Sequence, residues 1–136
     1  MKYLLDVNAL LAFGIREHEF HERVASWISE LSSRKTLELA TCSITELGFV
    51  RIIAQTPRYR FTAPEARTLL LQIKARHAEV FAFIPDDHDV SLIPSWVRYP
   101  KQITDGHLVQ LAKSNGAVFA TLDRRIPGAF LIPQPR

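Results

Sequence analysis

Short apolar runs alternate with longer amphipathic stretches along the whole chain. The first run, 3–5, stops at Asp6 and leads into a helical pattern over 9–13. Runs this short, bounded by polar or turn residues, are typical of buried strands. Comparable runs, rich in β-branched or aromatic residues, predict further strands at 37–41, 80–84, 117–122 and 130–132.

Helical patterns fill the spaces between these runs. Apolar residues recur at three- and four-residue spacing over 18–33, 43–55, 62–77 and 103–115. On the second of these helices we expect Leu47, Val50 and either Ile53 or Ala54 to face the core. Three prolines make the stretch 85–101 irregular, with room for a short helix.

Strands that alternate with helices, and that are apolar on both faces, favour a mainly parallel sheet covered on both sides. The pattern therefore predicts an α/β fold with a central sheet of about five strands. The 136 residues contain no linker and no internal repeat, so we expect a single domain, 1–136.

Composition limits the classes of protein without choosing one. A hydrophobic fraction of 47% is ordinary for a globular protein. No apolar stretch is long enough for a membrane span, and the first residues lack the pattern of a signal peptide. A single cysteine, Cys42, suggests a reducing compartment, and we expect a cytoplasmic protein. The net charge of +3 and the pI near 9.3 are compatible with a polyanionic partner but do not require one.

Four acidic residues stand at the ends of predicted elements. Asp6 and Asp123 end strands, whereas Glu46 and Asp105 lie in the first turns of helices. Each has an ordinary structural interpretation. Asp6 would cap a helix, Glu46 would complete a capping box that begins at Ser43, Asp105 would favour the helix dipole, and Asp123 would make a turn.

Taken together, the four acids have a second interpretation. In a doubly wound sheet, the carboxyl ends of strands and the N-termini of the following helices lie along one edge. Several carboxylates in one pocket repel one another unless a cation is present. Oxygen ligands without a nearby Cys or His set suit Mg²⁺ or Mn²⁺. The spacing thus favours metal-assisted hydrolysis of a phosphodiester.

The segments around these acids also resemble a known family. The resemblance rests on four segments in order, Leu4–Asn8, Ser43–Leu47, Ile103–Leu108 and Ala120–Arg124, which are similar to the four acidic motifs of the PIN domain family. More narrowly, the chain resembles the VapC toxins of bacterial toxin–antitoxin pairs. It departs from the family pattern at Gly106, where alanine is common.

The resemblance implies an α/β/α sandwich and a Mg²⁺- or Mn²⁺-dependent endoribonuclease. It also implies a homodimer and a cognate VapB-type antitoxin that blocks the active site. Carried over residue by residue, the catalytic and metal-binding acids would be Asp6, Glu46, Asp105 and Asp123. Supporting roles would fall to Asn8, Thr104 and Thr121. Arg124 and Arg125, which directly follow Asp123, are the best candidates for binding the RNA backbone. Lys101 is a further candidate.

Two alternatives stay open at this point. A housekeeping RNA-processing nuclease would carry the same acids, and one sequence does not reveal the RNA target. A non-catalytic RNA- or protein-binding module would not need them. Other residues receive structural interpretations: His107 as surface or packing, 86–89 as a solvated turn, and Trp27 and Trp96 as packing residues.

Overall fold

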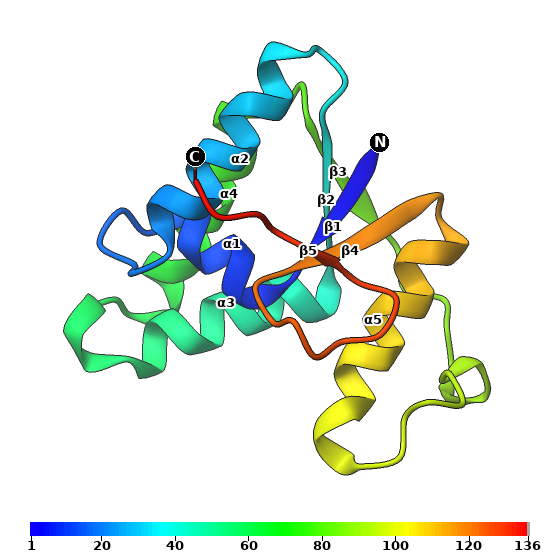
Figure 1. Cartoon of the computed structure of the whole chain (residues 1–136). Coiled ribbons are helices and arrows are strands. Elements are labelled where there is room, and N and C mark those ends of the chain that lie inside the picture. Colours follow the sequence, from blue (N-terminus) through cyan, green and yellow to red (C-terminus); the bar gives the residue numbers. More distant parts are fainter. Residues whose placement is uncertain (136) are drawn as a thin grey trace.

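The computed structural model describes residues 1–135, in which helices cover both faces of a five-stranded sheet (Figure 1). Along the chain the elements are β1 (Lys2–Leu5), α1 (Val7–Gly14), α2 (His21–Ser33), β2 (Glu38–Cys42), α3 (Ser43–Gln55), η1 (Pro57–Tyr59), α4 (Ala63–Arg76), β3 (Phe81–Ile84), η2 (Val90–Leu92), η3 (Pro100–Gln102), α5 (Ile103–Ser114), β4 (Ala117–Thr121) and β5 (Phe130–Leu131). The three η elements are single 3₁₀ turns. None of the helices within residues 1–135 has the length and apolarity needed to span a membrane.

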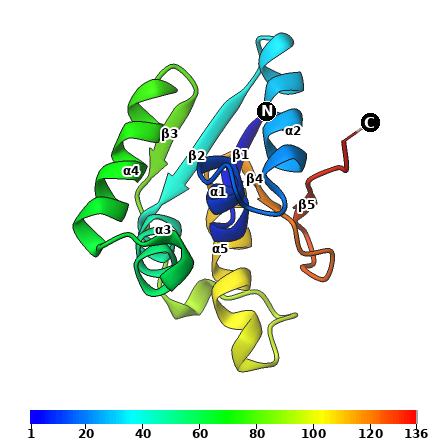
Figure 2. The same ribbon diagram turned by 90° about the vertical axis from the view of Figure 1, so that its left-hand side faces the viewer.

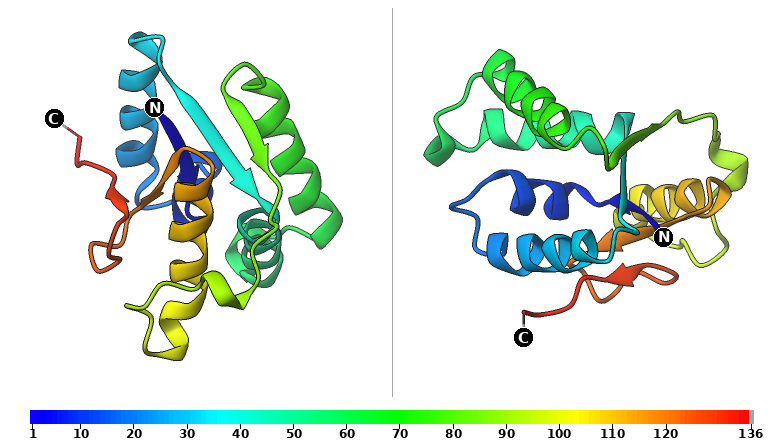
Figure 3. Two further views of the ribbon diagram at one scale, coloured as in Figure 1. Left: turned by 90° about the vertical axis from the view of Figure 1, so that its right-hand side faces the viewer. Right: turned by 90° about the horizontal axis from the view of Figure 1, so that it is seen from above.

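The strands lie in the order β3-β2-β1-β4-β5, and every neighbouring pair is parallel. This confirms the predicted α/β class and the number of strands. Helix α5 covers one face, where its Leu108 and Leu111 pack on Leu4 and Phe119. Helices α1 to α4 lie on the opposite side, as the views in Figures 2 and 3 show. Both faces of the central strands are therefore buried, which explains their unbroken apolar runs.

Strand register places the acidic residues. Leu5 of β1 is paired with Ala120 of β4, and the ladder continues as the Asp6 amide donates to the Ala120 carbonyl over 2.9 Å. The residues one step further, Asp6 and Thr121, therefore lie side by side at the carboxyl edge of the sheet. Helix α5 leads into β4 through a tight turn at Gly116, where φ is +68°. A helix of 12 residues and a strand of five have similar lengths, so the first turn of α5 returns to that same edge.

Three expectations about helices need correction. Helix α2 begins at His21 rather than at residue 18, because the Phe20 amide donates to His18 Nδ1 in a preceding turn. Helix α3 is capped by Cys42 together with Thr45, not by a box from Ser43 to Glu46. Leu47 does not face the core, since 65% of it is exposed. Ile53 is buried as predicted, and α3 also buries Phe49.

Candidate active site

Each carboxylate oxygen of Asp6 accepts one hydrogen bond. One carboxylate oxygen, Oδ1, accepts from the Val7 amide over 2.7 Å, so the residue does cap α1. The other, Oδ2, accepts from the Thr121 hydroxyl over 2.7 Å. Burial raises the pKa of Asp6, the two hydrogen bonds oppose this, and the nearby Asp123 charge raises it further. A carboxylate in this setting is costly to keep charged without a cation.

Asp123 is held by the residue two positions further on. Its Oδ1 accepts from the Arg125 amide over 2.9 Å and from Arg125 Nε over 3.1 Å, while Oδ2 accepts from the guanidinium Nη2 over 3.2 Å. These bonds hold the pKa of Asp123 below its ordinary value. The Asp123 amide donates to the Thr121 hydroxyl oxygen over 3.0 Å. Thr121 thus links two of the predicted acids through one buried hydroxyl.

Asp105 completes a group of three interacting aspartates. It comes from the first turn of α5 and is half-buried. Burial raises its pKa, and the charges of Asp6 and Asp123 raise it further. The structure therefore brings three of the four predicted acids close enough to influence one another.

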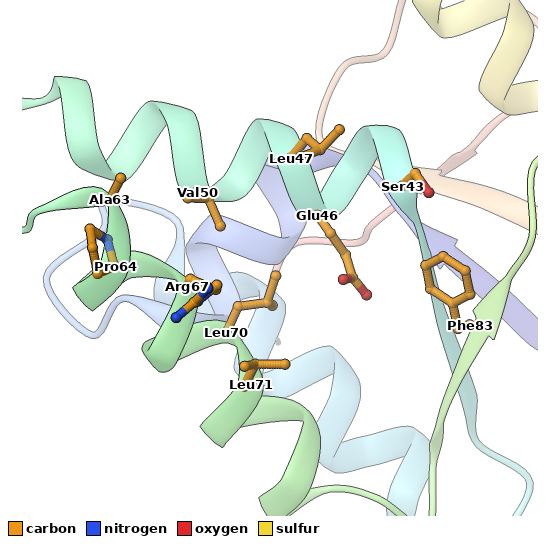
Figure 4. Close-up of a pocket in the computed structure, with 10 residues that line it drawn as sticks. All are labelled: Ser43, Glu46, Leu47, Val50, Ala63, Pro64, Arg67, Leu70, Leu71 and Phe83. Atoms are coloured by element: carbon orange, nitrogen blue, oxygen red, sulfur yellow. The ribbon is translucent and has the colours of Figure 1, made fainter.

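Glu46 lies in a different environment. Its Oε2 accepts from Lys74 Nζ of α4 and from the Thr41 hydroxyl, both over 2.5 Å. The Lys74 ammonium also lies 5.5 Å from the centre of the Phe83 ring. Figure 4 shows the Glu46 side chain extending into the hollow between α3, α4 and Phe83. The negative charges that raise the pKa values of Asp6 and Asp105 are those of other aspartates.

The predicted supporting residues differ in what they contact. Thr121 is buried and bonded as described, whereas Thr104 is exposed on α5. Asn8 is exposed and lines a hollow of about 470 Å³ together with Arg124 and Arg125. Arg125 is bonded to Asp123, although 80% of its side chain is exposed.

Sequence reasoning missed two features beside the aspartates. Trp96, interpreted as a packing residue, lines a hollow of about 700 Å³ that also reaches Asp105 and Asp123. His107, interpreted as surface or packing, has Nε2 2.5 Å from Asp86 Oδ2 and so ties α5 to the segment after β3. The hollow beside Trp96 could have been anticipated from the aromatic residues at 96 and 99, which lie just before the helix that carries Asp105.

The donor chemistry at this edge fits a hard divalent cation. The three residues offer only carboxylate oxygens, and the pKa values of Asp6 and Asp105 are raised, which a nearby positive charge would relieve. The side chains of residues 1–135 do not form a group of three or more His, Cys, Asp or Glu at spacing suited to a metal ion. Asp123 is instead bonded to Arg125.

Comparison with known proteins gives consistent matches over nearly the whole chain. The sequence profile of the PIN domain matches residues 3–129. Ribonuclease VapC44 of Mycobacterium tuberculosis is 39% identical over 140 residues, which cover 95% of this chain and 94% of that protein. Ribonuclease VapC38 of the same organism is 37% identical, with 98% and 91% covered.

A solved structure shares the fold at low sequence identity. The crystal structure of VapBC2 from Rickettsia felis, bound to a DNA fragment from its promoter, matches with a TM-score of 0.63. The sequences are 14% identical, and the match covers 96% of this chain and 97% of that chain. At this sequence identity, the similarity shows a shared fold.

Proposed function

The chain belongs to the PIN domain family, among the VapC ribonucleases, and from this membership we propose that it is a divalent-metal-dependent endoribonuclease. We propose further that it is the toxin of a type II toxin–antitoxin pair and acts in the cytoplasm as a single domain. The observation that carries the catalytic part is geometric: Thr121 links Asp6 to Asp123, and Asp105 and Asp123 line one hollow at the same edge of the sheet.

Asp6, Asp105 and Asp123 are the residues that would hold Mg²⁺ or Mn²⁺. The chemistry that such a cation would supply is the activation of water and the stabilisation of charge on the leaving oxygen. Thr121 keeps Asp6 from rotating, because its hydroxyl donates to Oδ2 while the Val7 amide donates to Oδ1. The fixed carboxylate can then meet the cation without reorganising, which is the usual benefit of preorganised ligands.

We propose two roles for Arg125, one in pairing with Asp123 and one in binding RNA. Its guanidinium is paired with Asp123. With that carboxylate holding a cation, the guanidinium would remain beside the site and would be able to bind an RNA phosphate. Arg124 lines the same hollow as Arg125 and is proposed as a second phosphate contact.

Glu46 stays the fourth proposed carboxylate. It stands in the motif that the resemblance assigns to the site, but it is paired with Lys74. Its participation requires that this ion pair opens. Thr104 and Asn8 are proposed only as polar neighbours, because neither is bonded to one of the aspartates within residues 1–135.

The proposed partners follow from the relatives. The similar Rickettsia felis structure is a VapBC complex, and we propose that a VapB-type antitoxin binds this chain and covers its active site. The substrate would be RNA, and a homodimer is proposed from the family resemblance.

The decisive experiment is RNA cleavage by purified protein in Mg²⁺, in Mn²⁺ and in EDTA. Wild type is compared with Asp105→Asn, and Glu46→Gln tests the fourth carboxylate separately. We expect cleavage that requires metal and is lost in Asp105→Asn, with circular dichroism confirming that the variant folds. Cleavage by folded Asp105→Asn at the wild-type rate would refute the assignment. Binding of RNA without cleavage or metal binding would favour a non-catalytic module.

A further inference from the structure

A hollow of about 700 Å³ opens beside two of the proposed catalytic aspartates. The residues of its wall that matter here are Trp96, Tyr99, Lys101, Asp105, Asp123 and Arg125. Its volume lies within the range of protein sites that hold small organic ligands. Because Asp105 and Asp123 form part of the wall, anything bound in the hollow lies next to the proposed site of cleavage.

The aromatic wall is held in place by specific contacts. The Gln102 side-chain oxygen accepts from the Arg98 amide over 2.8 Å and from the Tyr99 amide over 3.1 Å. These bonds fix the turn that carries Tyr99, although 60% of the residue is exposed. A rigid turn that presents an aromatic ring to solvent provides a surface for stacking at low entropic cost.

Gly106 fixes the other end of this wall. A Cβ atom there would lie 2.3 Å from Val97 Cγ2 and 3.7 Å from Trp96 Cη2. The absence of a side chain therefore lets the segment around Trp96 pack directly on the first turn of α5, beside Asp105. This gives a physical reason for glycine where the family commonly has alanine.

The chemistry of the wall suits one kind of ligand. Exposed aromatic rings bind nucleic-acid bases by stacking, and this binding tolerates every base. Unpaired RNA is recognised in this way because its bases are free to leave the helix stack. Lys101 and Arg125 supply positive charge for the phosphates on either side.

We propose that this hollow is a subsite for one unpaired RNA nucleotide next to the scissile phosphate, with its base stacked on Tyr99 and Trp96. The inference rests on the proposed ribonuclease function and adds to it a requirement for single-stranded RNA at that position. A second hollow, which shares Asp123 and Arg125 with the first, continues past Asn8. The strand would therefore pass over the aspartates from one hollow to the other.

The test uses the full chain and a short single-stranded RNA that carries 5-iodouridine, a base analogue that crosslinks to stacked aromatic rings under ultraviolet light. An Asp6→Asn background keeps the RNA intact. We expect mass spectrometry to find the crosslink at Tyr99 or Trp96. Crosslinks confined to aromatic residues outside both hollows, such as Phe83, would overturn the proposal.

Affinity for the same RNA, measured by fluorescence polarisation, provides the second readout. Tyr99→Ala should weaken binding by about tenfold, whereas Tyr99→Phe should keep most of it. Tyr59→Ala is the matched control, because Tyr59 is a partly exposed tyrosine of η1 that lines neither hollow. An equal loss in Tyr99→Ala and Tyr59→Ala, or no loss in either, would overturn the subsite.

Failure of this inference can be told apart from failure of the proposed function. If wild type cleaves RNA with metal but Tyr99→Ala binds and cleaves like wild type, only the subsite is wrong. If wild type neither binds nor cleaves any RNA, the function itself is wrong. If Tyr99→Ala weakens only the binding of an antitoxin peptide, the hollow is a protein-docking site and the proposal is overturned.

Discussion

At the scale of single residues, Asp6 combines the two interpretations that its sequence position allowed. It caps α1 through Oδ1, and it interacts with Asp105 and Asp123 at the edge of the sheet. A cap needs only one carboxylate oxygen, so the other is available for Thr121 and for a cation. A capping role therefore does not count against a catalytic one.

Thr121→Val tests how much the orientation of the aspartates matters. The substitution keeps the shape but removes a hydroxyl that donates to Asp6 and accepts from the Asp123 amide. We expect RNA cleavage to fall by about 10- to 100-fold, as is usual when the partner of a metal ligand is lost. The unfolding free energy should fall by about 1–3 kcal/mol, because a partly buried amide loses its acceptor.

Urea denaturation and cleavage rates measure the two effects of Thr121→Val. Thr68→Val is the control, since Thr68 is exposed on α4, away from the aspartates, and should tolerate the change. If both threonine variants cleave like wild type, Thr121 has no positioning role.

Arg125→Ala should separate metal binding from RNA binding. Removal of the guanidinium frees Asp123, so we expect Mn²⁺ to bind about twofold to fivefold more tightly, in line with the weakness of exposed ion pairs. RNA should bind less tightly, with the salt dependence reduced by about one phosphate contact. Calorimetry with Mn²⁺ and RNA titrations at several salt concentrations measure these changes. Arg124→Ala should affect only RNA; weaker Mn²⁺ binding in Arg125→Ala would contradict the proposed exchange.

At the scale of elements, hydrophobic periodicity located the strands and helices well but did not settle which face of a helix is buried. Helix α3 is apolar on two faces, and the spacing permitted either one. The structure buries Phe49 and Ile53 and leaves Leu47 facing the hollow between α3 and α4. Which face of α3 is buried depends on how α4 packs against it. The hydrophobic periodicity of α3 alone contains no information about that packing.

Gly106→Ala probes the packing of the segment before α5. Alanine favours a helix by about 1 kcal/mol over glycine, but here its Cβ would lie 2.3 Å from Val97 Cγ2. We expect the clash to outweigh the helix preference and to lower the unfolding free energy by about 1–3 kcal/mol. The double variant Gly106→Ala, Val97→Ala should lose less than the sum of the two single variants. Strict additivity in urea denaturation would show that the two side chains do not compete for space.

At the scale of the whole molecule, parallel topology explains why four distant acids were predictable as candidates and why their contacts were not. The rule that carboxyl ends of strands share an edge predicts Asp6, Asp105 and Asp123 near one another. In the structure Thr121 links Asp6 to Asp123, and Asp105 and Asp123 line one hollow. The same rule gives no information about side-chain partners. The pairing of Glu46 with Lys74 joins residues 28 positions apart, and the hollow beside Trp96 depends on packing against Gly106.

Metal removal and pH should act on the stability of the whole molecule through the buried aspartates. The pKa values of Asp6 and Asp105 are raised above the ordinary value of 3.8, so the folded state holds protons that the unfolded state has already lost. In EDTA, both residues therefore stabilise the fold increasingly as pH falls from neutral toward 3.8. The lowered pKa of Asp123 acts in the opposite direction, but in a separate window at and below that value. The lowered pKa of His18 also opposes the trend, since the unfolded state protonates first below pH 6.5.

The contribution of Asp6 is isolated by subtraction, because His18 is common to wild type and Asp6→Asn. In EDTA, we expect Asp6→Asn to be more stable than wild type near neutral pH, with the gap closing toward about pH 4. Saturating Mn²⁺ should raise the stability of wild type, by about 2.7 kcal/mol at a hundredfold excess over Kd, and should have little effect on the variant. Urea denaturation in EDTA and in Mn²⁺ across this pH range measures both effects. A variant less stable than wild type near neutral pH in EDTA would mean that the Asp6 carboxylate is stabilising as a structural cap, and that no cation is needed to offset its burial.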